Sequence, residues 1–211
     1  MNTKTLLTKL PSRNDLQKLC QSISVLDAIL SQDWEYRYYS YNKNWGKNEE
    51  FFEMRNGQGD QMQILFLKNS CVINVFSQEK GTQNKDNLAN DLPAQYKGFM
   101  FGEPINSIGT SYCFWTDEGG NWQTNQDDDL DDYSLEMLQI FDAKPTTYLD
   151  WATDYYDGDF VETGIPIDSV EKIYKHEILT KDLVLSIVEA LDDWNQFRDD
   201  LDEIGYPYNF G

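Results

Sequence analysis

The stretch QMQILFLKNSCVINVFS, residues 61–77, decides the fold class of this 211-residue chain. Its two apolar runs, residues 61–68 and 71–77, flank the dipeptide Asn69-Ser70. Short runs rich in Val, Ile and Phe favour strands, and a two-residue connection between two such runs is typical of a β-hairpin. The stretch therefore predicts a pair of adjacent antiparallel strands.

Further strand patterns lie on both sides of this hairpin. Before it, residues 50–55 lead into the turn RNGQGD, residues 55–60, whose glycines supply positive φ at little cost. Further back, WEYRYYSY at residues 34–41 alternates aromatic side chains with the period of a strand. After the hairpin, residues 111–116 and 121–125 flank a Gly-Gly turn and predict a second hairpin. The middle of the chain is expected to form a mainly antiparallel sheet.

Helical patterns lie at the two ends of the chain. Ser12 to Asp15 has the spacing of a capping box, and the apolar stripe after it predicts a helix that ends near Gln32. From about Asp131 onward, apolar residues again recur at helical spacing, and Gly205 with a following proline ends the last helix. One helix, then an antiparallel sheet, then helices is the order of an α+β fold.

The connections complete this expectation. The polar segment at residues 79–93 is expected to be a long loop, and residues 94–102 a short helix. Pro145 and Thr180 occupy positions that start helices. We expect one α+β domain over residues 1–211, with a near-neutral, sheet-rich half at 1–125 and an acidic, mostly helical half at 126–211.

The net charge of −20 is concentrated in the second half of the chain. Residues 1–100 hold 12 Lys or Arg and 11 Asp or Glu, whereas residues 101–211 hold 5 and 26. Such an anionic surface repels nucleic acid, so no direct nucleic-acid binding is expected. It attracts cations or a basic protein, and the alternative is an acidic surface that only keeps the protein in solution.

Cysteine usage and apolar runs bear on location. Cys20, Cys71 and Cys113 are an odd number without CxxC spacing, which favours buried free thiols in a reducing compartment. No apolar run approaches the roughly 20 residues of a membrane helix. The opening MNTKTLLTKLPSRND lacks a continuous apolar core and a small-residue cleavage site. We expect a cytoplasmic protein without a membrane span.

Two acidic clusters are the candidate partner-binding residues. The first lies in NQDDDLDDYSLE, residues 125–136, and the second in the last predicted helix. Both present closely spaced carboxylates that would attract a cationic surface. Their members are Asp127, Asp128, Asp129, Asp131 and Asp132 in the first cluster, and Asp199, Asp200, Asp202 and Glu203 in the second.

The first cluster also resembles a calcium loop in part. Counted from Asn125, oxygen-bearing residues occupy positions 1, 3, 5 and 12 of an EF-hand, but Leu130 stands at position 6, where a glycine is needed. Asp131 and Asp132 also suit the first turn of a following helix, where acids favour the positive dipole end. A second acidic turn, residues 154–162, is a helix end or a weak metal candidate. We assign no metal and no cofactor.

Aromatic residues and the single histidine complete the candidate sites. Six aromatic residues between Trp34 and Trp45 suit core packing or the stacking of sugar or base rings, and Tyr39, Tyr41 and Trp45 are the ones expected at the surface. His176 is the only histidine, which removes most histidine-based catalysis. A surface or capping role is expected for it, and no catalytic residue is assigned.

LPAQYKGFM, residues 92–100, resembles the LP-x-x-Y-K-x-F-hydrophobic signature of the SUKH-type immunity superfamily. These are α+β proteins that commonly neutralise bacterial toxins by binding them. The resemblance covers nine residues, and Gly102-Glu103-Pro104 follows where the family usually continues toward Asn-Gly-Gly. The turn RNGQGD, a Trp-bearing hairpin and the terminal EIGYP are also similar to bacterial proteins of unassigned function. The resemblance implies a bacterial binding protein and carries over no catalytic residue.

Three functions follow from these patterns. The leading hypothesis is a non-enzymatic binding protein of the immunity type, whose acidic half covers a basic toxin or nuclease. The alternative is a carbohydrate-binding or carbohydrate-processing protein, which requires a cleft where Tyr or Trp rings lie near two acids. A third is a structural module stabilised by calcium.

Overall fold

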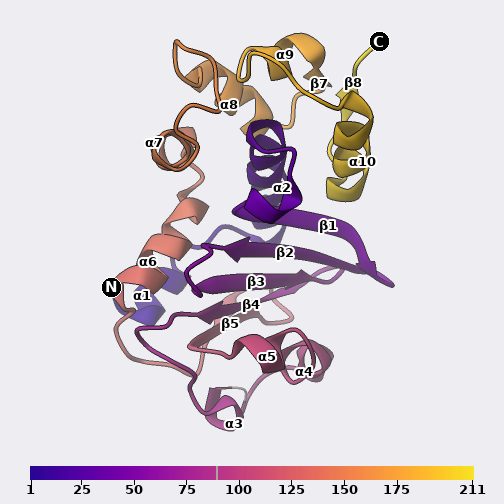
Figure 1. Ribbon diagram of the computed structural model, residues 1–211. Coiled ribbons are helices and arrows are strands. Elements are labelled where there is room, and N and C mark those ends of the chain that lie inside the picture. The colour runs from indigo at the N-terminus through magenta and orange to yellow at the C-terminus, as the bar shows by residue number, and fades with distance from the viewer. Residues whose placement is uncertain (89) are drawn as a thin grey trace.

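Within the residues that the structure describes, 1–88 and 90–211, six antiparallel strands form a sheet in the order of the chain (Figure 1). This computed structural model confirms the predicted α+β class. The hairpin predicted at residues 61–77 is the β3–β4 pair, in which Phe66 faces Cys71. The strands are β1 (Tyr39–Gly46), β2 (Glu49–Arg55), β3 (Gln61–Phe66), β4 (Cys71–Phe76), β5 (Tyr112–Thr116) and β6 (Trp122–Gln123).

Both faces of the sheet are buried. Successive residues of a strand point to opposite faces, so Phe52 and Ile64 belong to one apolar cluster and Phe51 and Leu65 to another. The first cluster continues into α2 and the helices after residue 131. The second continues into the short helices between β4 and β5. The sheet is therefore the middle layer of three.

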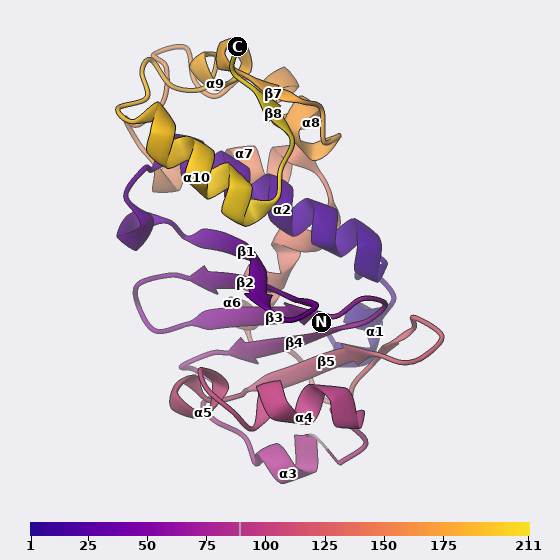
Figure 2. The same cartoon turned by 90° about the vertical axis from the view of Figure 1, so that its right-hand side faces the viewer.

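The helices gather on opposite sides of the sheet, with α2 and α7–α10 beyond β1 and α3–α5 beyond β5 (Figures 1 and 2). Two short strands, β7 (Leu179–Thr180) and β8 (Tyr208–Asn209), pair in parallel among the last helices. The helices are α1 (Thr3–Leu7), α2 (Arg13–Leu30), α3 (Lys85–Leu88), α4 (Ala94–Met100), α5 (Ile105–Ile108), α6 (Asp132–Gln139), α7 (Pro145–Tyr155), α8 (Ile167–Tyr174), α9 (Lys181–Leu185) and α10 (Trp194–Ile204), with 3-10 turns η1 (Trp34–Tyr36) and η2 (Ile140–Asp142).

Helix boundaries follow the predicted signals in most places. Ser12 is the N-cap of α2, and its hydroxyl accepts from the backbone N–H of Asp15. Thr180 caps α9 in the same way through Leu183, and Pro145 is the first residue of α7. Gly205 ends α10 in the left-handed conformation, with φ of 82°, where a side chain would be strained.

The structure differs from the sequence prediction at the start of the sheet. Residues 34–41 were predicted to be a strand, but residues 34–36 form η1, and β1 begins only at Tyr39. The side chain of Asp33 caps η1 by accepting from the N–H of Glu35. The prediction relied on the aromatic alternation and did not consider the capping position of Asp33. The part of it that placed a strand at residues 34–38 was therefore wrong.

Short helices account for the other differences. The segment predicted as a loop at residues 79–93 contains α3, and α1, α5 and α8 were not predicted. The helix predicted to start at Thr180 is also short and ends at Leu185. Helices of four to eight residues carry too few turns to show a clear apolar period, so sequence periodicity misses them.

Asp27 of α2 connects three segments of the core. Its fully buried carboxylate accepts hydrogen bonds from the hydroxyls of Tyr148 at 2.7 Å and Tyr156 at 2.9 Å. It also accepts from the backbone N–H groups of Tyr38 at 3.0 Å and Tyr39 at 2.8 Å. Burial raises the pKa of Asp27 to about 7, although all four hydrogen bonds act to lower it. One side chain thus joins α2, the start of β1 and the region of α7.

At pH 4, Asp27→Asn is expected to lower the free energy of unfolding by about 1–3 kcal/mol, because the amide carries one more donor than the protonated carboxyl group and points it at groups that also donate. The pKa of Asp27 is higher in the folded protein than its ordinary value of 3.8. Its contribution to stability is therefore fully present below about pH 4 and is lost as the pH rises through about 7. The variant lacks this contribution, so the difference between wild type and variant should shrink over that range in urea unfolding.

The matched control is Asp154→Asn, which removes one charge from an exposed position. It should change the free energy of unfolding by no more than about 0.5 kcal/mol. A difference between wild type and Asp27→Asn that stays constant from pH 4 to pH 8 would contradict the assignment.

Candidate functional site

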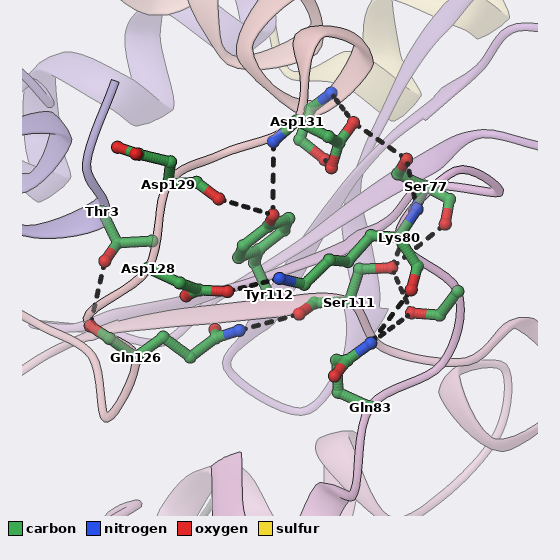
Figure 3. Close-up of polar contacts among 12 residues, drawn as sticks. Thr3, Ser77, Lys80, Gln83, Ser111, Tyr112, Gln126, Asp128, Asp129 and Asp131 are labelled. Atoms are coloured by element: carbon green, nitrogen blue, oxygen red, sulfur yellow. Dashed lines mark hydrogen bonds and ion pairs between the residues drawn. The ribbon is translucent and has the colours of Figure 1, made fainter.

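The first acidic cluster lies where the chain runs from β6 into α6, beside the N-terminal segment (Figure 3). Asp127 pairs with Lys4, with 2.6 Å between Oδ2 and Nζ, and Asp128 pairs with Lys80. The backbone N–H of Thr3 donates to the carbonyl of Asp128 at 3.1 Å. Two carboxylates of this cluster are thus already neutralised by lysines of the first half of the chain.

Asp131 is the N-cap of α6, which confirms that this part of the run opens a helix. Its carboxylate accepts from the N–H of Ser134 at 2.9 Å and from the hydroxyl of Ser77 at 3.0 Å. Burial acts to raise its pKa, but these hydrogen bonds hold the pKa of Asp131 below its ordinary value. The hydroxyl of Tyr112 donates to the carbonyl of Asp129 at 3.2 Å (Figure 3).

The first cluster therefore mainly connects the start of α6 to the N-terminal segment and to the residues that follow β4. Asp127, Asp129 and Asp132 are exposed, whereas Asp128 and Asp131 are partly buried and bonded to the chain. Over residues 1–88 and 90–211, no group of three or more His, Cys, Asp or Glu side chains is placed to hold a metal ion. Asp129 and Asp132 can meet a partner without loss of a side-chain contact, whereas Asp127 would first have to leave Lys4.

Asp131→Ala should lower the free energy of unfolding by about 1–2 kcal/mol, because α6 loses its N-cap and Ser77 loses a partner. Thermal or urea unfolding measures this change. Glu136→Gln, at an exposed position of α6, is the control and should be close to neutral. Equal stability of the two variants would show that the Asp131 cap does not stabilise the start of α6.

The second acidic cluster lies on α10. Spacings of three and four residues place Asp199, Asp202 and Glu203 on neighbouring parts of the helix surface, and all three are exposed. Asp200 is turned toward the protein, where its Oδ2 lies 2.6 Å from Nη2 of Arg37. The Arg37 side chain is only 5% exposed and also donates to the carbonyls of residues 31 and 32.

A pocket of about 280 Å³ lies between the last turn of α10, β1 and β2. Glu203 at its wall accepts from the side-chain amide of Asn42 at 2.7 Å. Aromatic rings and carboxylates line the pocket together, which is the arrangement that the carbohydrate alternative requires. Its residues are Ser24, Trp34, Arg37, Tyr39, Ser40, Tyr41, Asn42, Trp45, Phe51, Glu53, Pro104, Asp200, Glu203 and Ile204.

Not all the aromatic residues expected at the surface are there. Trp45 is 45% exposed, as predicted, but Tyr39 and Tyr41 are each 3% exposed and belong to the core. The prediction for the two tyrosines was wrong because their side chains face α2. Trp34, for which no exposure was predicted, is 50% exposed and carries the Arg55 guanidinium over its ring at 3.9 Å.

The electrostatics of the pocket are unusual for a helix end. Asp200 and Glu203 lie in the last turn of α10, which contains no basic residue. The C-terminal end of a helix carries partial negative charge, so acids there are unfavourable. Burial, and next the charge of Asp200, raise the pKa of Glu203. The site therefore holds negative charge that its own helix does not compensate.

The pocket combines residues that sequence reasoning missed. Ser24 and Glu53 were not among the candidate binding residues, and no local motif marks them. Arg37 and Asp200 are 163 residues apart in the chain, so only the folded structure brings them together. Two signals pointed to this place, the charge density of the second acidic cluster and the aromatic group between Trp34 and Trp45.

The remaining reactive side chains are structural. Cys20, Cys71 and Cys113 are buried free thiols, as expected, and burial raises the pKa of each. His176 is half-buried, with Nε2 at 2.8 Å from the carbonyl of Lys18, and burial lowers its pKa. None of these four residues lines the pocket.

Comparison with known proteins found no matching family model, no matching curated protein and no matching solved structure. Among the helices of residues 1–88 and 90–211, none is both long and apolar enough to cross a membrane.

Proposed function

We propose that this chain is a non-enzymatic binding module of the immunity type, whose acidic helical half covers a basic protein such as a toxin or nuclease. The observation that carries the proposal is uncompensated negative charge. Residues 126–211 contain 23 Asp and Glu against 5 Lys and Arg. Among the described residues, only Asp127, Asp128, Asp142, Glu171 and Asp200 of these acids form ion pairs.

The charge chemistry favours a basic protein partner. Proteins that bind phosphate backbones carry cationic grooves, and an anionic surface accelerates association with them. The same surface repels nucleic acid itself. The resemblance of residues 92–100 to immunity proteins agrees with such a partner, although this segment forms α4, on the side of the sheet away from α10.

The structure divides the candidate residues into two sets. Asp128, Asp131 and Asp200 make internal ion pairs or hydrogen bonds, so replacing them would disturb the fold. The exposed set makes fewer internal contacts, an ion pair from Asp127 to Lys4 and a hydrogen bond from Asn42 to Glu203, and is where a partner would be met. Its members are Asp127, Asp129, Asp132, Asp199, Asp202 and Glu203.

The experiment begins with a tagged full-length chain, used to retain proteins from its source cells at low and at moderate salt, with mass spectrometry of what is held. One basic protein retained in near-equal molar amount is the expected result. A retained partner that is not basic, or none, would count against the proposal. The partner so identified then serves in the kinetic measurement.

Asp199→Asn/Asp202→Asn should lower the association rate with that partner by about threefold to tenfold at low salt and reduce its salt dependence. The reason is that exposed charges act mainly through long-range attraction. Asp154→Asn/Asp157→Asn is the control, with the same charge change on exposed residues at the end of α7. If both double variants behave alike, net charge matters but α10 is not the contact surface.

Carbohydrate binding is the second candidate function. The mixed lining of the pocket favours it, because Trp rings stack on sugars and carboxylates bond to hydroxyls. A saturable change in intrinsic fluorescence with simple sugars would support it.

A further inference from the structure

The pocket beneath the last turn of α10 contains a buried polar atom without a partner. Ser24 lines this pocket and is 1% exposed, and over residues 1–88 and 90–211 its hydroxyl makes no hydrogen bond. Buried polar groups are nearly always hydrogen-bonded, so an unpartnered hydroxyl at a pocket wall indicates a group that a ligand satisfies.

The charge of the pocket selects a cationic ligand. Glu53, Asp200 and Glu203 line it against a single cation, Arg37. Arg37 is engaged by Asp200 and two backbone carbonyls. Glu53 pairs with Arg55 at 3.6 Å, so among the described residues Glu203 is the acid of the pocket without a cationic partner. The negative end of the α10 dipole adds to this potential. A bound cation would relieve the repulsion between neighbouring acids, whereas a neutral sugar would not.

The rings favour a planar cation. The guanidinium of Arg55 already stacks on Trp34 at the rim, at 3.9 Å from the ring centroid. Trp45 covers Phe51 on one side, with 4.3 Å between centroids, and remains 45% exposed. A guanidinium stacks flat on an aromatic face and binds a carboxylate through two N–H groups of its planar fork. A lysine ammonium can approach the same groups but has neither the flat face nor the fork.

The size of the pocket favours a single side chain. Its volume of about 280 Å³ is below the roughly 300–1,000 Å³ of sites for drug-sized ligands. An oligosaccharide would extend well beyond it. One long side chain of a larger partner fills such a space and leaves the surrounding acids of α10 to the partner's surface.

We infer that this pocket receives the guanidinium of an arginine side chain from the basic partner, between Trp45 and the carboxylates of Glu53 and Glu203. The inference rests on the proposed function and names the group that anchors the partner. Glu203 is a binding residue, Trp45 supplies the stacking face, and Ser24 supplies a hydrogen-bond acceptor at the wall.

The test uses the full-length chain and the probe N-acetyl-L-arginine methylamide, followed by the NMR signals of the tryptophan indole N–H groups and by fluorescence. Saturable shifts at millimolar probe concentration are expected. N-acetyl-L-citrulline methylamide has nearly the same shape without the charge, and it should not bind. If citrulline or a methyl glycoside binds as well as arginine, the cationic assignment is overturned.

Glu203→Gln should weaken arginine binding by about tenfold, because it removes one charge and keeps an oxygen for Asn42. Asp192→Asn is the matched control: it removes one exposed charge before α10, whose 11 residues span about 16 Å. Equal weakening by both variants would overturn the pocket as the binding place and leave only a general charge effect.

The two proposals fail separately. If the arginine probe does not bind, while Asp199→Asn/Asp202→Asn still slows association with a basic partner, the pocket assignment falls and the proposed function stands. If arginine binds but no basic protein is retained from cells, the pocket assignment stands and the proposed function falls.

Discussion

The buried carboxylate of Asp27 is the constraint on which the rest of the structure depends. It receives four donors from two segments, the start of β1 and the region of α7, and so connects both of them to α2. Because two of the donors are the backbone N–H groups of Tyr38 and Tyr39, the carboxylate sets where β1 begins. A strand that used these two N–H groups for sheet pairing would leave the buried carboxyl group with fewer hydrogen bonds, which is unfavourable.

The candidate site is a consequence of that starting point. With β1 beginning at Tyr39, Arg37 falls just before the strand and reaches Asp200 of α10. This ion pair holds the last turn of α10 against β1, where Asn42 meets Glu203. The pocket lies between these two contacts. The position of the pocket therefore follows from core packing. Its negative charge comes from carboxylates that lie outside the hydrophobic core.

The sequence predicted what local patterns determine. The β3–β4 hairpin, the capped helix after Ser12 and the helix end at Gly205 each depend on residues close together in the chain, and each is confirmed. The pocket could not be predicted, because Ser24, Glu53 and Glu203 come from three distant segments. Charge density identified both acidic clusters but could not distinguish the first, which is largely joined to the N-terminal segment, from the second. That distinction depends on Lys4 and Lys80, which only the fold brings near.

The position of α10 beside β1 has a further consequence. β1 ends the six-stranded order and has a strand partner on one side only, and such edges invite pairing with another chain and aggregation. At the opposite edge, β6 is only two residues long and offers little backbone for such pairing. The first half of β1 is covered instead by a helix rich in negative charge, held through Arg37, whereas residues 43–46 are exposed. The same acids that would attract a basic partner would thus repel a second copy of the chain. One surface would then serve both to bind the partner and to keep the chain from aggregating.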